Sequence, residues 1–186
     1  MKITVYLGSS VGKDEKYARL AEDLGVWIAL HGHTLVYGGA RLGLMNILAE
    51  AVRKNGGRII GVMPEFMIRA KRNRNDLDEL IITGDMAERR KKMLELGDAY
   101  IALPGGPGTL EEISEAISAS RLRLHRNPCI FVNTDGYYEP LRQQFQMMME
   151  KGFLRKEEIA DVYFAADLDE ITALLEERNR IQIGSI

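Results

Sequence analysis

Short apolar runs alternate with longer amphipathic segments along the whole chain of 186 residues. The short runs are rich in Val, Ile, Leu and Tyr and are continuously apolar, which is typical of strands that helices cover on both faces. We expect strands at residues 2–7, 34–37, 58–63, 80–83, 100–103, 129–132 and 161–165. Short buried strands of this kind predict an α/β fold.

Segments with helical spacing separate these strands. Between the first two, Tyr17, Leu20, Leu24 and Trp27 recur at intervals of three and four residues, and Gly32 ends the pattern. We expect helices at residues 13–30, 44–54, 86–96, 109–124, 136–152 and 168–180. Alternation of this kind predicts a doubly wound, mostly parallel sheet flanked by helices. No shift in composition marks a linker, so residues 1–186 are expected to form a single domain.

Composition and charge exclude several classes of function. The net charge of −2 provides no field for nucleic acid or an acidic membrane surface, and neither is an expected partner. No apolar run approaches the roughly 18 residues of a membrane span, and the N-terminus lacks a signal-peptide pattern, so a cytoplasmic protein is expected. The single cysteine, Cys129, lies in an apolar run and is predicted to be a core residue rather than a nucleophile.

The histidines give no sign of a metal site. His31, His33 and His125 lack a metal-ligand spacing with carboxylates. His31 and His33 flank a glycine at the end of a predicted helix, where capping is the simpler interpretation. We expect neither a metal nor an organic cofactor.

Four stretches follow predicted strands and should therefore meet at one edge of the sheet, where such folds bind ligands. They are residues 8–10, 37–43, 85–90 and 104–112. Glycine turns in three of them, including Gly8-Ser9 and Gly38-Gly39, allow a ligand to approach the backbone closely. Their spacing matches neither the dinucleotide fingerprint nor an ATP-type P-loop. The combination indicates a ligand of nucleotide or sugar-phosphate size.

The last of these stretches, which has the most glycines, joins a buried strand to a helix. It reads Pro104-Gly105-Gly106-Pro107-Gly108-Thr109-Leu110-Glu111-Glu112. A glycine turn at a helix N-terminus offers free N–H groups and a positive dipole end to an anion such as phosphate. Glu112 has two interpretations that the spacing leaves open. It is either a carboxylate of the site or, with Thr109, the second half of a helix capping box.

Two basic segments also have two interpretations each. Arg89, Arg90, Lys91 and Lys92 lie in the early turns of a predicted helix, where the dipole disfavours cations. They either contact an anionic ligand or form a solvated helix end. Residues 66–76 form a second basic stretch, for which a solvated loop is favoured over a ligand role.

At this point the motifs resemble those of the Lonely Guy (LOG) family, the cytokinin riboside 5′-monophosphate phosphoribohydrolases once labelled lysine decarboxylases. The family signature Pro-Gly-Gly-x-Gly-Thr-x-x-Glu is complete at residues 104–112, and residues 86–93 match Met-His-x-Arg-Lys-x-x-Met in part. The similarity extends to residues 8–10, 36–45 and 135–138 and so covers nearly the whole chain. Departures from the family pattern are Ala87, Arg90 and Pro107.

The resemblance implies a Rossmann-like homodimer that hydrolyses the N-glycosidic bond of a nucleoside 5′-monophosphate without a cofactor. Its products are a free base and ribose 5-phosphate. Arg89 and Glu112 would be the catalytic pair. Substrate contacts would come from Gly8, Ser9, Gly38, Gly39, Met86, Arg90, Gly105, Gly106, Gly108, Thr109 and Glu111. The departures leave the base open, between adenine and N6-prenylated adenine.

Two other functions compete with hydrolysis. Molybdenum cofactor carrier proteins resemble this layout and bind a phosphate-bearing ligand without converting it. Lysine decarboxylation, implied by the older family label, generally needs a lysine that holds pyridoxal phosphate. No lysine of this sequence lies in a convincing setting for that bond.

Overall fold

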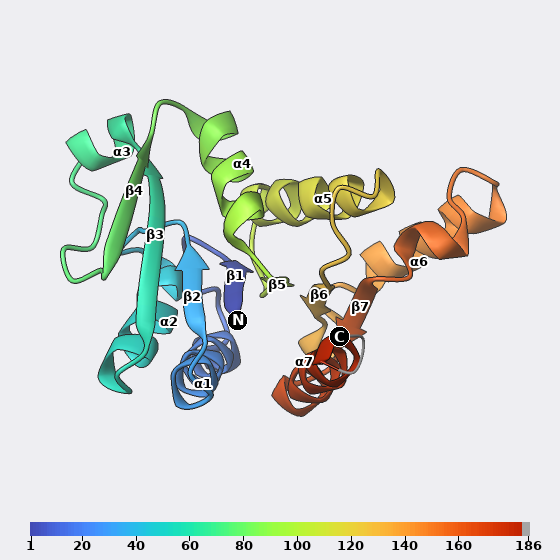
Figure 1. Ribbon diagram of the computed structural model, residues 1–186, viewed down its shortest axis with the longest axis horizontal. Coiled ribbons are helices and arrows are strands. Elements are labelled where there is room, and N and C mark those ends of the chain that lie inside the picture. Colours follow the sequence, from blue (N-terminus) through green and yellow to red (C-terminus); the bar gives the residue numbers. More distant parts are fainter. Residues whose placement is uncertain (184–186) are drawn as a thin grey trace.

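A computed structural model describes the backbone of residues 1–183 and the side chains of residues 1–178 (Figure 1). Seven strands form one sheet in the order β4-β3-β2-β1-β5-β6-β7. All pairs of neighbouring strands run parallel, which confirms the predicted doubly wound α/β architecture. The strands are β1 Lys2–Tyr6, β2 Thr34–Tyr37, β3 Arg58–Pro64, β4 Glu79–Thr83, β5 Ala99–Ala102, β6 Cys129–Val132 and β7 Val162–Ala165.

The helices lie on both sides of this sheet (Figure 1). α1, α2 and α7 supply side chains to one apolar cluster, and α4, α5 and α6 to the other. The helices are α1 Glu15–Leu30, α2 Gly43–Lys54, α3 Glu65–Arg69, α4 Met86–Leu96, α5 Pro107–Arg121, α6 Glu139–Glu150 and α7 Leu168–Ile183, with short 3₁₀ turns at Thr134–Gly136 and Lys156–Ile159.

Alternation along each strand divides the core into two halves. Ile3 and Val5 of β1 face the α1 side, whereas Tyr6 faces the α4 side. Because both faces are covered, the strands are apolar at nearly every position, as the sequence pattern indicated. Cys129 is fully buried in β6, as predicted. No helix among the described residues is long and apolar enough to cross a membrane.

Several element ends differ from the prediction for local reasons. α1 begins at Glu15 because the carboxylate of Asp14 accepts a hydrogen bond from the Lys16 N–H at 3.0 Å and caps the helix. α6 begins at Glu139 because Asp135 and Gly136 have positive φ values of 52° and 72°. Residues 66–76, expected to be a loop, include most of the short helix α3.

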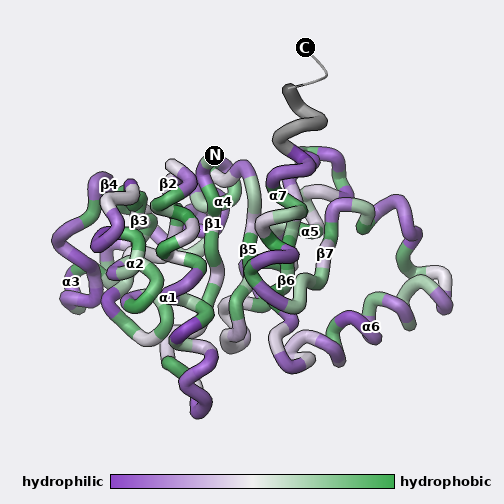
Figure 2. The backbone as a smooth tube through the Cα atoms, turned by 90° about the horizontal axis from the view of Figure 1, so that it is seen from below, coloured by the Kyte–Doolittle hydropathy of each residue, from purple (hydrophilic) through white to green (hydrophobic). Residues whose placement is uncertain are grey.

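α6 is only weakly embedded. None of its residues is buried, and Figures 1 and 2 both show it extending away from the sheet together with the loop that follows. Its apolar side chains Leu141 and Phe145 pack only partly against the cluster on the α4 side.

Candidate active site

The loops that follow β1, β2, β3 and β5 enclose a pocket of about 240 Å³ at the carboxyl edge of the sheet. The order of strands reverses here, because β2 and β5 flank β1 on opposite sides. Such a switch point is where open α/β sheets bind ligands. The predicted site residues that line this pocket are Ser9, Gly38, Arg89, Gly106, Gly108, Thr109 and Glu112.

The N-terminus of α5 opens into the pocket without a capping side chain. Gly106 is the N-cap residue, and Pro107 and Gly108 form the first turn with Thr109. No side chain of residues 1–178 accepts a hydrogen bond from the first N–H groups, so they remain available to an anion. The backbone arrangement that the predicted phosphate cradle requires is therefore present at this turn.

The capping-box interpretation of Thr109 and Glu112 is wrong. The helix begins two residues before Thr109, at Pro107, so Thr109 lies inside the first turn rather than at the N-cap. Proline at the first helical position has a suitable φ and lacks only an N–H that would be unpaired anyway. Thr109 instead packs under the turn, where a β-carbon on Gly105 would overlap its hydroxyl. Glu112 is consequently free for a role in the pocket.

Arg89 of α4 and Glu112 of α5 form an ion pair inside the pocket. Nη1 of Arg89 lies 3.1 Å from Oε1 of Glu112, and the two side chains are only 10% and 11% exposed. Arg89 is further held by a hydrogen bond of 3.1 Å from its Nε to the carbonyl of Val62. A buried pair anchored in this way fixes the carboxylate relative to the glycine turn.

Burial sets the protonation behaviour of Glu112. Loss of solvent raises the pKa of this carboxyl, and the Glu111 and Glu115 carboxylates raise it further. The positive charges of Arg89 and Arg90 act in the opposite direction without cancelling the rise. A carboxylate with a raised pKa is a better proton acceptor than one in water, which suits a general base.

A second hollow of about 310 Å³ adjoins the pocket and shares Ser9 and Gly106 with it. Gly8 and Gly105 line this hollow, together with Tyr17 and Tyr137. The Tyr137 hydroxyl donates a hydrogen bond of 2.6 Å to the carbonyl of Gly105 and so supports the glycine turn from outside.

Four predicted residues lie beside the pocket instead of lining it. Arg90 pairs with Glu111 at 3.3 Å and with Glu115 at 2.9 Å, which ties α4 to α5. The sulfur of Met86 lies 4.0 Å from Nη1 of Arg89. Gly39 accepts a hydrogen bond from the N–H of Arg74 at 3.0 Å. These residues support the site, and the basic run on α4 is neither wholly in contact with the pocket nor wholly a solvated end.

Several pocket residues escaped the sequence analysis. Tyr6 at the end of β1 and three methionines, Met45, Met67 and Met93, complete the walls. The position of Tyr6, at the end of a strand and just before the first glycine turn, could have indicated that it lies at the pocket. The methionines come from three different helices, and no local pattern brings them together.

The basic stretch at residues 66–76 has a structural role at Arg74. This side chain is 6% exposed and bonds to Asp76 at 2.8 Å, to Glu50 at 2.9 Å and to Asn46 at 2.9 Å. It thereby fastens the loop to α2. Lys71 and Arg72 remain exposed, as expected for a solvated loop.

The histidines act locally. His31 caps the end of α1, where its Nδ1 lies 2.9 Å from the carbonyl of Trp27. Nε2 of His125 lies 2.9 Å from the carbonyl of Ala116. Within the described residues, no group of three or more His, Cys, Asp or Glu side chains is placed to hold a metal ion.

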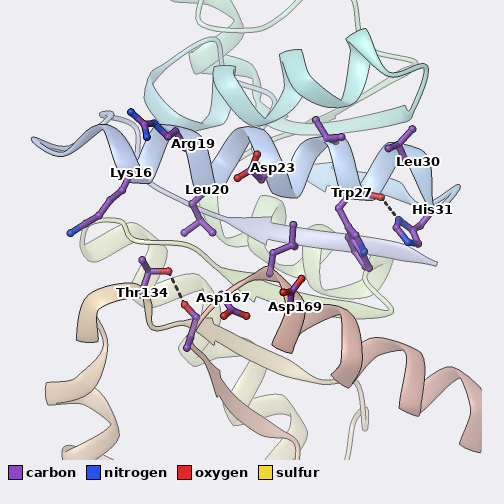
Figure 3. Close-up of a pocket in the computed structure, with 13 residues that line it drawn as sticks. Lys16, Arg19, Leu20, Asp23, Trp27, Leu30, His31, Thr134, Asp167 and Asp169 are labelled. Atoms are coloured by element: carbon purple, nitrogen blue, oxygen red, sulfur yellow. Dashed lines mark hydrogen bonds between the residues drawn. The ribbon is translucent and has the colours of Figure 1, made fainter.

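A larger hollow of about 670 Å³ lies between α1 and the start of α7 (Figure 3). Leu20, Asp23 and Trp27 of α1 face Asp167 and Asp169 across it. None of the predicted site residues lines this hollow, so the candidate site remains at the carboxyl edge of the sheet.

Comparison with known proteins identifies the family. A family model described as a possible lysine decarboxylase matches residues 45–175. A cytokinin riboside 5′-monophosphate phosphoribohydrolase of Rhodococcoides fascians is 42% identical over 168 residues, covering 90% of this chain and 85% of that protein. The chain belongs to the LOG family. The resemblance carried by the glycine turn is thereby confirmed.

A second family member supports this placement, and a more distant relative shares the fold. The phosphoribohydrolase LOG4 of Arabidopsis thaliana is 37% identical over 176 residues, covering 95% of this chain and 82% of that protein. Among solved structures, the molybdenum cofactor carrier protein of Chlamydomonas reinhardtii matches with a TM-score of 0.72 and 26% identity, over 95% of this chain and 96% of that one. LOG-family enzymes and cofactor carriers therefore share this architecture.

Proposed function

We propose that this protein hydrolyses the N-glycosidic bond of a nucleoside 5′-monophosphate, AMP or a cytokinin riboside 5′-monophosphate. The observation that carries the proposal is the buried pair of Arg89 and Glu112, placed in one pocket with the uncapped N-terminus of α5. The identity of 42% to a phosphoribohydrolase gives independent support. Both features match a reaction in which a phosphate is held while a carboxylate acts on the sugar.

The phosphate would bind first to the N–H groups around Gly106 and Gly108. Backbone N–H donors at a helix N-terminus suit a dianion such as phosphate. Once the phosphate is bound there, the ribose attached to it is held in a fixed position. Binding energy from the phosphate is then available for the reaction at the anomeric carbon.

Glu112 would act at the ribose. Cleavage of the bond between C1′ and the base nitrogen builds positive charge on the sugar, and a carboxylate beside C1′ stabilises that charge. Water attacks C1′ and gives one proton to Glu112 as the bond to the base breaks. The departing base nitrogen takes up a proton from solvent, and Glu112 returns its proton to solvent before the next turnover. The balanced result is nucleotide plus water to free base plus ribose 5-phosphate.

Arg89 would keep Glu112 in place and ionised. Its planar guanidinium holds Oε1 through Nη1 and is itself anchored at Val62. A positive charge beside the carboxylate limits the rise in the pKa of Glu112, so that the base form is available near neutral pH.

Release of free base from AMP by the purified protein tests the proposal directly. Chromatography should detect adenine and ribose 5-phosphate in equal amounts. AMP that binds without turnover would support the alternative, a carrier of a phosphate-bearing ligand like the Chlamydomonas protein of the same fold. Carbon dioxide released from lysine would instead support the older family label.

The base is the finer question. Met45, Met67 and Met93 give the pocket flexible apolar walls, which tolerate an extra alkyl substituent on the base. Turnover of AMP and of N6-prenylated AMP, compared through kcat/KM, decides between the two.

We also infer a homodimer in the cytoplasm. Large apolar side chains are exposed just after α5, at Leu122 (72%) and Leu124 (74%), and just after α6, at Phe153 (81%). Exposed apolar groups of this size are typical of association surfaces. Light scattering on the purified protein should give twice the mass of 21.0 kDa, and cell fractionation tests the location.

A further inference from the structure

Tyr6 lies in the same pocket as the proposed catalytic pair, Arg89 and Glu112. It ends β1 and is 2% exposed. Its ring lies nearly parallel to that of Tyr100, with an angle of 6° and 6.5 Å between centroids. Packing against Met93 and Ile113 in the same cluster fixes the ring between α4 and α5.

The hydroxyl of Tyr6 differs from those of its tyrosine neighbours. Tyr100 donates to the carbonyl of Leu94 at 2.7 Å, and Tyr138 donates to that of Leu103 at 2.7 Å. Tyr6 makes no such bond within the described residues. Its hydroxyl is also not among the fully enclosed polar atoms without a partner, which are Trp27 Nε1, Tyr37 Oη and Arg53 Nε. It is therefore a donor without a partner among the described residues, on a side chain that lines the pocket.

Glu112 has a matching free acceptor. Arg89 holds Oε1, and no described group bonds to the second carboxylate oxygen. The charged groups that act on Glu112 are Arg89 and Arg90 of α4 and Glu111 and Glu115 of α5. Burial raises the pKa of the Tyr6 phenol, and the neighbouring titratable groups Glu112, Tyr100, Cys129 and Glu115 raise it further. The phenol therefore stays protonated, and so remains a donor, throughout the working pH range.

We propose that Tyr6 is a positioning residue for Glu112, donating its hydroxyl through one water to the free carboxylate oxygen. The inference rests on the proposed hydrolysis and adds a residue to it. With Arg89 on one oxygen and Tyr6 on the other, the carboxylate cannot rotate away from the sugar. A donor to the ionised form also favours that form and keeps the base available at lower pH.

Tyr6→Phe tests this role because it removes only the hydroxyl. We expect kcat for AMP to fall about tenfold with KM changed less than about twofold, and the acid limb of kcat to move up by about one pH unit. Tyr138→Phe is the matched control, since it also removes a hydroxyl from this cluster but does not line the pocket. An unchanged acid limb in Tyr6→Phe would overturn the inference.

A second measurement separates this inference from the proposed function. The Glu112 carboxyl can be titrated by ¹³C NMR in the substrate-free protein, with Glu112→Gln used to assign its signal. Tyr6→Phe should raise the pKa of Glu112, whether or not the wild-type protein releases adenine. No change in that pKa would overturn the role of Tyr6, whereas a shift in a protein without turnover would overturn only the hydrolysis.

Discussion

Gly38 and Arg89 are in direct contact because Gly38 has no side chain. A β-carbon built on Gly38 would overlap Nη2 of Arg89. The guanidinium lies against the turn that follows β2, with its Nε bonded to the carbonyl of Val62 and its Nη1 paired with Glu112. The ion pair therefore requires a glycine at position 38. The reason is space for the guanidinium rather than backbone conformation, because φ of Gly38 is not in the left-handed region.

Gly38→Ala should therefore disable the site while leaving the fold intact. The methyl group pushes the guanidinium away from Glu112, and a displacement of about 1 Å in catalytic geometry can cost about a hundredfold in rate. We expect kcat/KM for AMP to fall by about that factor, with circular dichroism unchanged. Gly84→Ala is the control, because its β-carbon would meet only the flexible end of Glu88 at 3.2 Å. Equal activity in the two variants would contradict the contact.

Glu112→Gln should abolish most hydrolysis. The amide keeps the size of the side chain but cannot accept a proton or stabilise positive charge, so kcat should fall at least about a hundredfold. Glu115→Gln, one turn further along α5, removes the pair with Arg90 and the smallest of the charges that act on Glu112, and should retain nearly full activity. Adenine release under saturating AMP measures both. Wild-type turnover in Glu112→Gln would remove this residue from the mechanism.

The pH dependence of kcat should reveal the raised pKa of Glu112. The carboxylate is the active form, so activity is lost as pH falls through the pKa of this group. Burial raises that pKa above its ordinary value of 4.5, which places the acid limb at a higher pH than for an exposed glutamate. Initial rates at constant ionic strength between pH 4 and 8 check this. A limb at or below pH 4.5 would show that Glu112 is not the titrating base.

Arg74→Met should destabilise the protein without touching the pocket. The substitution leaves Asn46, Glu50 and Asp76 without their shared partner, and because both acids are partly exposed the loss should be roughly 1–2 kcal/mol. Urea unfolding measures it. Arg72→Met, an exposed change two residues earlier, should alter stability by less than about 0.5 kcal/mol. Similar urea midpoints for the two variants would show that the contacts of Arg74 with Asn46, Glu50 and Asp76 do not stabilise the fold.

The strands, most helix positions and the edge that carries the candidate site could be predicted from the sequence alone. Those features depend on short-range patterns, since apolar runs, helical spacing and glycine turns act within a few neighbouring residues. The parallel arrangement then places every strand-to-helix turn at one edge. The motif at residues 104–112 also identified Glu112 as a candidate, although its spacing fitted a capping box equally well.

The three-dimensional structure was needed to exclude the capping box and to add further residues to the candidate site. It showed that α5 begins at Pro107, which frees Glu112, and that Arg89 lies 3.1 Å from it across two helices. It also placed Tyr6 beside the pair and buried Arg74 in a loop that looked solvated. Each of these contacts joins residues of different elements, so it depends on how helices pack on the sheet rather than on any local pattern of the chain.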